Sequence, residues 1–419
     1  MKLDIVGKNV IRVDGLSKVT GRAIYPDDIY MDNMLYGKTL RSAVPHANIN
    51  IDISEAEKVK GVVKILTYKD VPNNSHGVLF KDHEVFCSKK VRRIGDPIAF
   101  VIAENKKICE IALEKIKVNY EEIESVFDPI EAMSENAPKI HDKSNIIYHY
   151  KLRRGNIDKG FKESHVIVEN TYKTQMMDHA FLQPEAGVSY IDEEGRVTVI
   201  VSTQYPHYDR DEIAQALNLK TDQVRVINAN VGGAFGGRED ITLQIHLALA
   251  AYLLKQPVKT VYSREESFLA HDKRHPMIMK YRTGADKDGK LLALEAEIIG
   301  DAGAYASWSR NVLRKAGVHA TGPYYIPNVK VDSIAVYTNN PFTGAMRGFG
   351  ATQVAIAYEQ QMDILAEKLG IDPITIRKIN MFKKGSETAT GQILTESVPL
   401  EECLNKIIEG MDFNLSTKE

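Results

Sequence analysis

A glycine-rich segment at residues 230–239, N-V-G-G-A-F-G-G-R-E, carries the strongest sign of chemistry in this chain. Glycines let backbone amides approach a bound anion or a planar cofactor closely, and the helix expected to follow would add a field that favours negative charge. The spacing G-G-x-x-G-G does not meet the G-x-G-x-x-G pattern of a dinucleotide site. The segment therefore predicts a ligand-binding loop, with a purely structural turn as the alternative.

Two further segments supply polar and aromatic side chains. Residues 339–350 read N-N-P-F-T-G-A-M-R-G-F-G, where Arg347 offers a hydrogen-bond donor and Phe349 a stacking face for a planar heterocycle. Residues 202–207, S-T-Q-Y-P-H, form a polar cluster at a predicted strand end, where ligand contacts often lie. The text H-D-K-R-H at 271–275 lacks the glutamate of a zinc-binding H-E-x-x-H helix and favours a solvated turn.

The elements that must position these loops alternate between strands and helices, so we predict an α+β protein. The sequence divides into a lead-in at 1–20, a domain at 21–130, a polar linker at 131–150 and a second domain at 151–419. Predicted strands lie at 34–41, 61–67, 97–102, 117–120, 166–174, 197–203, 224–228, 277–283 and 291–300. Predicted helices lie at 54–59, 106–116, 209–217, 241–255, 351–369 and 400–410.

Composition excludes several partners. The chain has 419 residues, a net charge of -2 and no block of like charges, which argues against nucleic acid and an anionic membrane. The first residues contain charges and a glycine where a secretory signal needs an apolar run, so we expect a cytoplasmic protein. The cysteines Cys87, Cys109 and Cys403 are far apart in sequence, so any iron–sulfur cluster would lie on another chain.

Taken in order, these motifs resemble the molybdenum hydroxylase family of xanthine dehydrogenases and aldehyde oxidases. The resemblance also uses R-V-D-G-L-S-K-V-T-G-R-A-I-Y at 12–25, L-R-S-A-V-P-H-A at 40–47, G-D-P-I-A at 95–99 and V-N-Y-E at 118–121. It implies an N-terminal α/β hammerhead domain, followed by the first part of a molybdopterin-binding α+β domain. Residues 151–419 would then be the N-terminal half of that domain in the family's large subunit.

The resemblance implies a role for each matching residue near the cofactor. Gln204 would lie near the molybdenum, and Arg347 near its equatorial ligands. Ala234, Phe235 and Gly236 would hold the metal-proximal face of the pyranopterin. The dithiolene of the cofactor holds the metal, so no protein ligand to molybdenum is expected.

Three more residues match substrate contacts of the family. Glu239 matches a carboxylate that contacts heterocyclic substrates, and Phe349 an aromatic that stacks on the substrate ring. Arg314 matches a substrate-orienting arginine if a gap is allowed. A catalytic general base is not expected on this chain, because the family's glutamate base belongs to the C-terminal half and would lie on a partner chain.

The implied reaction is hydroxylation of an electron-poor carbon beside a ring nitrogen, with oxygen taken from water. Nicotinate-oxidising members of the family divide this subunit between two chains, so we expect conversion of nicotinate to 6-hydroxynicotinate, and activity only with partner subunits. A purine or xanthine hydroxylase, favoured by Glu239, is one alternative. A non-catalytic binding protein derived from the family is the other.

The implied cofactor is molybdenum-molybdopterin in its cytosine dinucleotide form, with a terminal sulfido or selenido ligand. The implied partners are a second molybdopterin subunit, an FAD subunit and a subunit with 2Fe-2S clusters. The loop before Arg347 has no cysteine, which argues against copper-bridged carbon monoxide chemistry.

Overall fold

A computed structural model describes residues 3–410 of the chain, which fold into two compact units. Unit 1 consists of the chain up to residue 77 together with residues 81–122 and 179–271. Unit 2 consists of residues 78–80, residues 123–178 and the chain from residue 272 onward. Each unit is therefore built from separate stretches of sequence. The domain limits expected from the sequence stay predictions.

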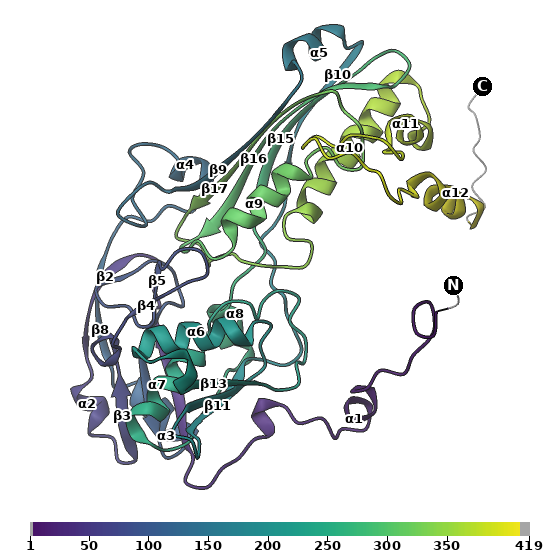
Figure 1. The fold of residues 1–419 in the computed structure, drawn as a ribbon. Helices are drawn as coiled ribbons and strands as arrows, with labels where there is room; N and C mark the ends of the chain where they lie inside the picture. The colour runs from purple at the N-terminus through teal and green to yellow at the C-terminus, as the bar shows by residue number, and fades with distance from the viewer. Residues whose placement is uncertain (1–2, 411–419) are drawn as a thin grey trace. The chain divides into compact units, whose positions relative to one another are not determined.

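Unit 1 combines short helices with three sheets (Figure 1). Its helices are α1 (Gly15–Val19), α2 (Ser54–Glu57), α3 (Lys106–Leu113), α6 (Pro206–Leu217), α7 (Gln244–Leu254) and α8 (Arg264–Ala270), with 3-10 turns η1 (Pro26–Asp28), η2 (Tyr68–Asp70) and η3 (Thr221–Gln223). Its strands are β1 (Leu35–Arg41), β2 (Ala47–Asp52), β3 (Val62–Leu66), β4 (Ser75–His76), β5 (His83–Glu84), β6 (Lys90–Val91), β7 (Pro97–Ala103), β8 (Lys117–Glu122), β11 (Ala186–Ile191), β12 (Val197–Val201), β13 (Val224–Asn228) and β14 (Val258–Val261).

A seven-stranded mixed sheet forms the centre of unit 1, in the order β13-β12-β11-β14-β1-β7-β3. The strand β7 is buried along almost its whole length because its sequence, P-I-A-F-V-I-A, is apolar on both faces. The parallel pair β1 and β14 joins segments more than two hundred residues apart in sequence. Helix α7 packs on β11 and β12 with eight buried residues, which fixes the chain that leads into it.

Unit 2 is an α+β unit around one large sheet (Figure 1). Its helices are α4 (Pro129–Ala132), α5 (Ile157–Glu163), α9 (Ser309–Val318), α10 (Ala351–Leu369), α11 (Pro373–Asn380) and α12 (Leu400–Gly410). Its strands are β9 (Ile146–Arg154), β10 (Val166–Lys173), β15 (Met277–Ala285), β16 (Leu291–Gly303) and β17 (Asn328–Tyr337).

The five strands of unit 2 are ordered β10-β15-β16-β17-β9, and the two faces of this sheet differ. On β15, the buried residues Met277, Met279 and Tyr281 alternate with Lys280 and Arg282. Alternation with a period of two places apolar side chains on one face and charged side chains on the other. The helices α9 and α10 cover the apolar face, where their side chains share one hydrophobic core with the sheet.

The predicted α+β class is confirmed, and helices α10 and α12 have the limits expected from the sequence. The helix after the glycine-rich segment was predicted from residue 241, but α7 begins only at Gln244. Its N-terminus is therefore not directly beside the glycines, because a short irregular stretch intervenes. Within residues 3–410, no helix combines the length and apolarity that crossing a membrane requires.

Candidate functional site

The glycine-rich segment of unit 1 is a tight loop that presents one aromatic ring. Phe235 has a φ of 56° and is 50% exposed, and its neighbours Gly233 and Gly236 also have positive φ. A side chain other than glycine at positive φ costs of order 1–3 kcal/mol and persists only where the surroundings impose it. The loop therefore keeps an apolar ring exposed to solvent in a strained backbone conformation. These are the properties expected of a preformed stacking surface for a ligand.

Gln204 joins this loop to the carboxylate at its end. Its side-chain Oε1 accepts hydrogen bonds from the backbone N–H of Gly236 at 2.9 Å and of Arg238 at 3.4 Å. Its Nε2 donates to Glu239 Oε1 at 3.4 Å. Burial raises the pKa of Glu239, although a hydrogen bond from Tyr205 lowers it in part. An exposed amide with a fixed orientation therefore lies beside a partly buried carboxyl group whose pKa is raised by burial.

Two side chains behind the loop hold it in place. Gln183 Oε1 accepts from Gly232 N at 2.7 Å, and Gln183 Nε2 donates to Ser202 Oγ at 3.0 Å. The Arg238 guanidinium donates through Nε to the carbonyl of Gly233 at 2.9 Å and through Nη2 to the carbonyl of Gln183. Arg238 is only 4% exposed, and burial lowers its pKa to about 10. The loop is therefore fixed from the side opposite to Phe235.

A layer of rings lies beneath these contacts in unit 1. The Arg238 guanidinium lies 4.2 Å from the centre of the Phe181 ring, which in turn packs on His271. His271 Nδ1 is 3.0 Å from Glu185 Oε1, and both residues are buried. Burial acts to raise the pKa of Glu185, but the hydrogen bond and charge of His271 outweigh it and leave the pKa lowered.

The second predicted loop follows β17 in unit 2 and leads directly into α10. Phe349 has a φ of 54°, and the glycines on either side of it also have positive φ. Arg274 Nη2 donates to the backbone carbonyl of Arg347 at 2.8 Å, and Arg274 Nη1 donates to Thr352 Oγ1 at 2.9 Å. The side chain of Arg347 is exposed. Arg274 thus fixes the backbone of the loop and leaves the Arg347 guanidinium available.

A buried carboxyl group holds the start of the second loop. Asp301 Oδ1 accepts hydrogen bonds from Thr338 Oγ1 at 2.7 Å and from Gly303 N at 2.8 Å, and its Oδ2 accepts from Asn340 Nδ2 at 2.6 Å. Burial raises the pKa of Asp301 to about 6, against these hydrogen bonds. Asp301 therefore fixes residues 338–340, at the start of the segment that leads to Arg347 and Phe349.

The outer side of α9 and the Phe349 ring line a cavity of about 360 Å³. Arg314 and Lys315 both line it, and Lys315 Nζ lies 5.9 Å from the centre of the Phe349 ring. The Trp308 ring meets the Phe349 ring edge-on, with centroids 6.1 Å apart. A cavity with one aromatic wall and two cations suits a planar anion.

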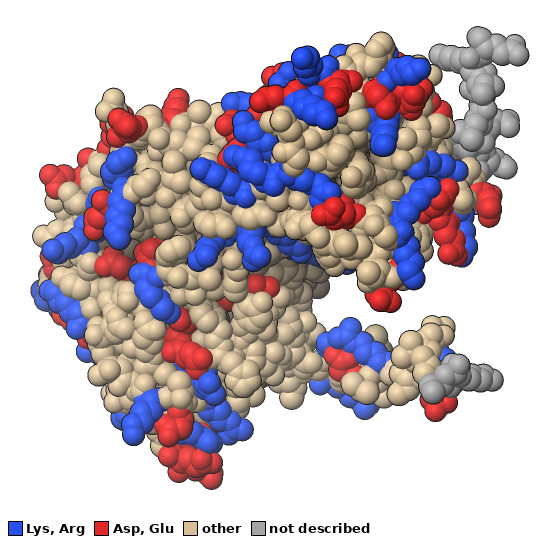
Figure 2. Space-filling view, turned by 45° about the horizontal axis from the view of Figure 1, so that its top comes forward, with Lys and Arg blue, Asp and Glu red and all other residues tan. Residues whose placement is uncertain are grey.

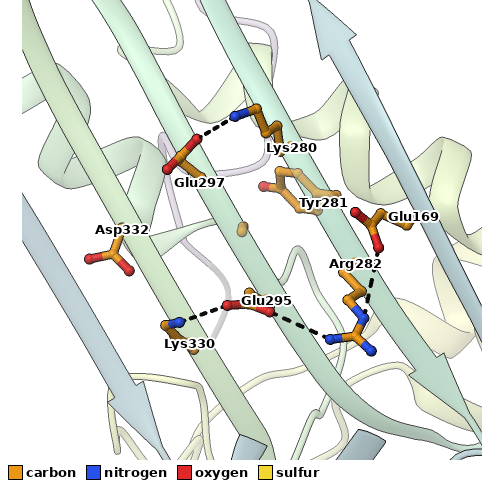
Figure 3. A pocket seen from close by; sticks show the side chains of 9 residues that line it. Glu169, Lys280, Tyr281, Arg282, Glu295, Glu297, Lys330 and Asp332 are labelled. Carbon is orange, nitrogen blue, oxygen red and sulfur yellow. Dashed lines mark hydrogen bonds and ion pairs between the residues drawn. The ribbon is translucent and has the colours of Figure 1, made fainter. Parts of the chain in front are cut away.

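A second hollow, of about 270 Å³, lies on the charged face of the unit 2 sheet (Figure 3). Its charges neutralise one another across the strands. Lys280 is 2.9 Å from Glu297, Lys330 is 2.7 Å from Glu295, and Arg282 is 3.9 Å from Glu295. Figure 2 likewise shows basic and acidic side chains interspersed on the visible surface. The hollow is a solvated sheet face whose charges are balanced within the sheet.

The structure brings the sequence-predicted residues together in two sets. Gln204, Ala234, Phe235, Gly236 and Glu239 lie within one loop system of unit 1. In unit 2, Arg314 and Phe349 line one cavity, and Arg347 lies on the same loop as Phe349 without lining that cavity. The roles assigned to these residues stay predictions.

Sequence reasoning missed three of the residues that shape these sites. Lys315 lines the same cavity as Arg314 and faces the Phe349 ring. Its only signal in the sequence was its position four residues after Asn311, which places both residues on one face of the helix. Arg238 and Arg274 gave no signal, because a sequence does not show that an arginine turns inward onto backbone carbonyls. The prediction that the H-D-K-R-H segment is a solvated turn is wrong, because His271, Asp272 and His275 are buried. His275 Nε2 is 2.7 Å from Ser309 Oγ, and the described residues hold no cluster of metal-binding side chains.

Comparisons with known proteins identify both parts of the chain. Residues 20–124 match the family model of the aldehyde oxidase and xanthine dehydrogenase a/b hammerhead domain. Residues 140–381 match the model of the molybdopterin cofactor-binding domain. The order of a hammerhead domain and a molybdopterin-binding domain, expected from the resemblance, is thereby confirmed.

Relatives of two lengths match this chain. It is 47% identical over 407 residues to the nicotinate dehydrogenase large molybdopterin subunit of Eubacterium barkeri, covering 97% of this chain and 96% of that protein. It is 32% identical over 412 residues to the xanthine dehydrogenase molybdenum-binding subunit of Escherichia coli O157:H7, covering 94% of this chain but only 54% of that protein.

A solved structure also matches nearly the whole of this chain. The aldehyde oxidoreductase of Desulfovibrio gigas superposes with a TM-score of 0.91 at 30% sequence identity, covering 95% of this chain and 46% of that one. The chain thus spans nearly all of one relative and about half of others. It belongs to the molybdopterin-binding family of aldehyde oxidases and xanthine dehydrogenases.

Proposed function

We propose that this chain is the cofactor-holding half-subunit of a molybdenum hydroxylase that converts nicotinate to 6-hydroxynicotinate. The observation that carries the proposal is the fixed arrangement of Gln204 and the exposed Phe235 around one glycine-rich loop. A protein that only bound a ligand would have no need of an exposed amide held in one orientation beside this ring. The 47% identity to a nicotinate dehydrogenase subunit supports the substrate.

The residues of unit 1 fit a planar anionic cofactor. The Phe235 ring is half exposed. Gly233 and Gly236, which lie before and after it in sequence at positive φ, carry no side chain that would keep a cofactor away from the backbone. Gln204 uses one Nε2 proton on Glu239, so its second Nε2 proton would be free to hold a bound cofactor by a hydrogen bond. When bound, molybdenum-molybdopterin accepts two electrons from the substrate carbon. We propose the cytosine dinucleotide form, with a terminal selenido or sulfido ligand.

In unit 2, we propose that Phe349 stacks on the substrate ring and that Arg314 and Lys315 attract its carboxylate. The edge-on contact with Trp308 fixes the plane of the Phe349 ring. The two cations line the same cavity as that ring. An anionic pyridine ring therefore finds both a stacking surface and opposite charge. We propose that Arg347, on the same loop, contacts the cofactor.

A purine or xanthine hydroxylase is the second candidate, and Glu239 favours it. The partly buried carboxylate of Glu239 can accept a hydrogen bond from a ring N–H of a purine. The Glu239→Gln variant replaces this carboxylate by an uncharged amide and keeps the shape. It should lower activity on hypoxanthine and leave nicotinate turnover within about twofold if nicotinate is the substrate.

The proposed assembly is cytoplasmic and contains a second molybdopterin subunit with the general base, an FAD subunit and a subunit with 2Fe-2S clusters. The test is native purification of the complex, followed by analysis of molybdenum, selenium, iron and flavin and by assays with nicotinate and hypoxanthine. The Gln204→Leu variant should lose turnover by at least tenfold, whereas Gln223→Leu, on the surface of η3, should not. A chain that purifies alone and free of metal would refute the proposal in favour of a non-catalytic binding protein.

A further inference from the structure

We infer that residues 3–24, called the N-terminal arm below, form the docking segment for the polypeptide that carries the second half of the family's molybdopterin-binding subunit. The existence of that polypeptide rests on the proposed function. The inference concerns only which part of this chain holds it.

The arm exposes apolar side chains at an unusual density. Nine of the thirty large hydrophobic residues that are exposed among the described residues lie in these 22 positions. Ile11 is 90% exposed, Val13 102% and Val19 83%. No residue of the arm is buried. Exposed apolar side chains gathered on one short segment are a sign of an interaction site.

The arm does not find cover within its own unit. Helix α1 has only five residues and no buried one, and it is held mainly by local contacts such as Ser17 Oγ donating to the Asp14 carbonyl at 3.0 Å. Isolated helices shorter than about 12 residues are marginal in water. The arm therefore requires an external surface to hold one conformation.

The root of the arm is fixed beside the cofactor-facing loop. Asn230, at the start of the glycine-rich segment, donates through Nδ2 to the carbonyl of Ile24 at 2.8 Å. Lys259, which is 1% exposed, donates to the carbonyl of Ile29 at 3.1 Å, and its Nζ lies 3.8 Å from the centre of the Tyr30 ring. A partner polypeptide that binds along the whole arm would therefore reach the glycine-rich loop. The second half of the subunit must come there if it supplies the general base.

The comparison with longer relatives selects this occupant over a second copy of the chain. The Desulfovibrio gigas enzyme shares this fold over 95% of this chain, but this chain covers only 46% of that enzyme. More than half of that polypeptide therefore has no counterpart in this chain. Its missing molybdopterin-binding part is the surface that we infer the arm to bind.

Charge adds a condition on the partner surface. The arm carries Lys8, Arg12, Lys18 and Arg22 against two aspartates. Asp14 accepts from both Arg12 and Lys18, at 2.7 Å for Lys18. Lys8 and Arg22 carry most of the remaining positive charge, so the partner should present an apolar groove with an acidic rim.

The first test places a photo-crosslinking amino acid at Val13 in the native multi-subunit complex. The expected product joins this chain to the second molybdopterin polypeptide, and hydrogen exchange at residues 3–24 slows in the complex relative to the isolated chain. A crosslink to a second copy, to the FAD subunit or to the 2Fe-2S subunit would overturn the inference, as would an arm that exchanges equally fast in both.

The second test compares two double variants by their affinity for the second molybdopterin polypeptide. Each exposed aliphatic side chain that becomes buried contributes roughly ten- to hundred-fold in affinity. The variant Ile11→Asp with Val13→Asp should therefore bind at least a hundredfold more weakly. The control, Val63→Asp with Ile111→Asp, places the same charges on exposed positions of β3 and α3 and should bind within about threefold of the unchanged chain.

These outcomes separate the inference from the proposed function. A complex that contains molybdenum and turns over nicotinate, and that keeps its affinity when the arm is altered, overturns the inference alone. A chain that copurifies with no other polypeptide and no metal overturns both.

Discussion

Replacement of Arg238 by methionine should destabilise unit 1 by about 2–5 kcal/mol. Two hydrogen bonds from a charged donor to the carbonyls of Gly233 and Gln183 contribute about 1.5–3 kcal/mol each, and the contact with Phe181 contributes about 2 kcal/mol. Against this, burial lowers the pKa of Arg238 to about 10, which corresponds to a cost of about 3 kcal/mol for desolvating the cation. The difference leaves the net cost of the substitution.

The assay is thermal unfolding followed by near-ultraviolet circular dichroism, with hydrogen exchange at residues 230–239. For a unit of about 200 residues, each kcal/mol shifts the Tm by roughly 2–4 °C, so we expect a decrease of about 4–20 °C. The Tm of Arg238→Lys should lie between those of the unchanged chain and of Arg238→Met, because lysine keeps the charge but not the forked geometry. Arg264→Met is the control, since the less buried Arg264 donates to the Leu182 carbonyl at 2.8 Å and not to the glycine-rich loop. An unchanged Tm and unchanged loop exchange in Arg238→Met would refute the reasoning.

Other sites give three further predictions. Gly303→Ala should cost more than about 3 kcal/mol in urea unfolding, because its φ is 64° and a Cβ would lie 2.1 Å from a backbone carbonyl oxygen, whereas Gly195→Ala, in open space, should cost about 1 kcal/mol. The pKa of Asp301 is raised to about 6, so the folded state binds this proton more tightly than the unfolded state, and the stability it contributes at low pH is lost as pH rises from about 4 to 6. Asp301→Asn should remove about 3 kcal/mol of that pH dependence between about pH 4 and 7, and an unchanged slope would contradict it. Lys315→Met should raise KM for nicotinate about threefold without changing that for hypoxanthine, whereas Arg310→Met, which removes the same charge elsewhere on α9, should change neither.

Local signals made much of the fold predictable. The apolar periodicity and the G-I-D-P sequence after the helix predicted where α10 begins and ends. The D-K-D-G turn predicted the hairpin formed by β15 and β16. The parallel pairing of β1 with β14 could not be predicted, because no local pattern tells which distant strand completes a sheet. The inclusion of residues 179–271 in unit 1 follows from that pairing.

The candidate site was predictable where backbone conformation dictates residue type. Both loops are revealed by glycines, and the structure places two glycines of each loop at positive φ, namely Gly233, Gly236, Gly348 and Gly350. Side chains that act from behind the loops were not predictable, because Arg238 and Gln183 are long polar residues that most often face water. The sequence could not show that Lys315 faces the Phe349 ring, because this depends on how α9 is turned relative to that ring.

The interleaving of the two units has a consequence for synthesis on the ribosome. The last segment of unit 1 ends at residue 271, before β15 of unit 2 begins at Met277. Strand β10 ends at Lys173 and must wait for about 100 further residues before its partner β15 exists, which at 5–20 residues per second takes about 5–20 s. Unit 1 can therefore close first, while two strands of unit 2 remain open edges that nascent-chain chaperones would need to protect.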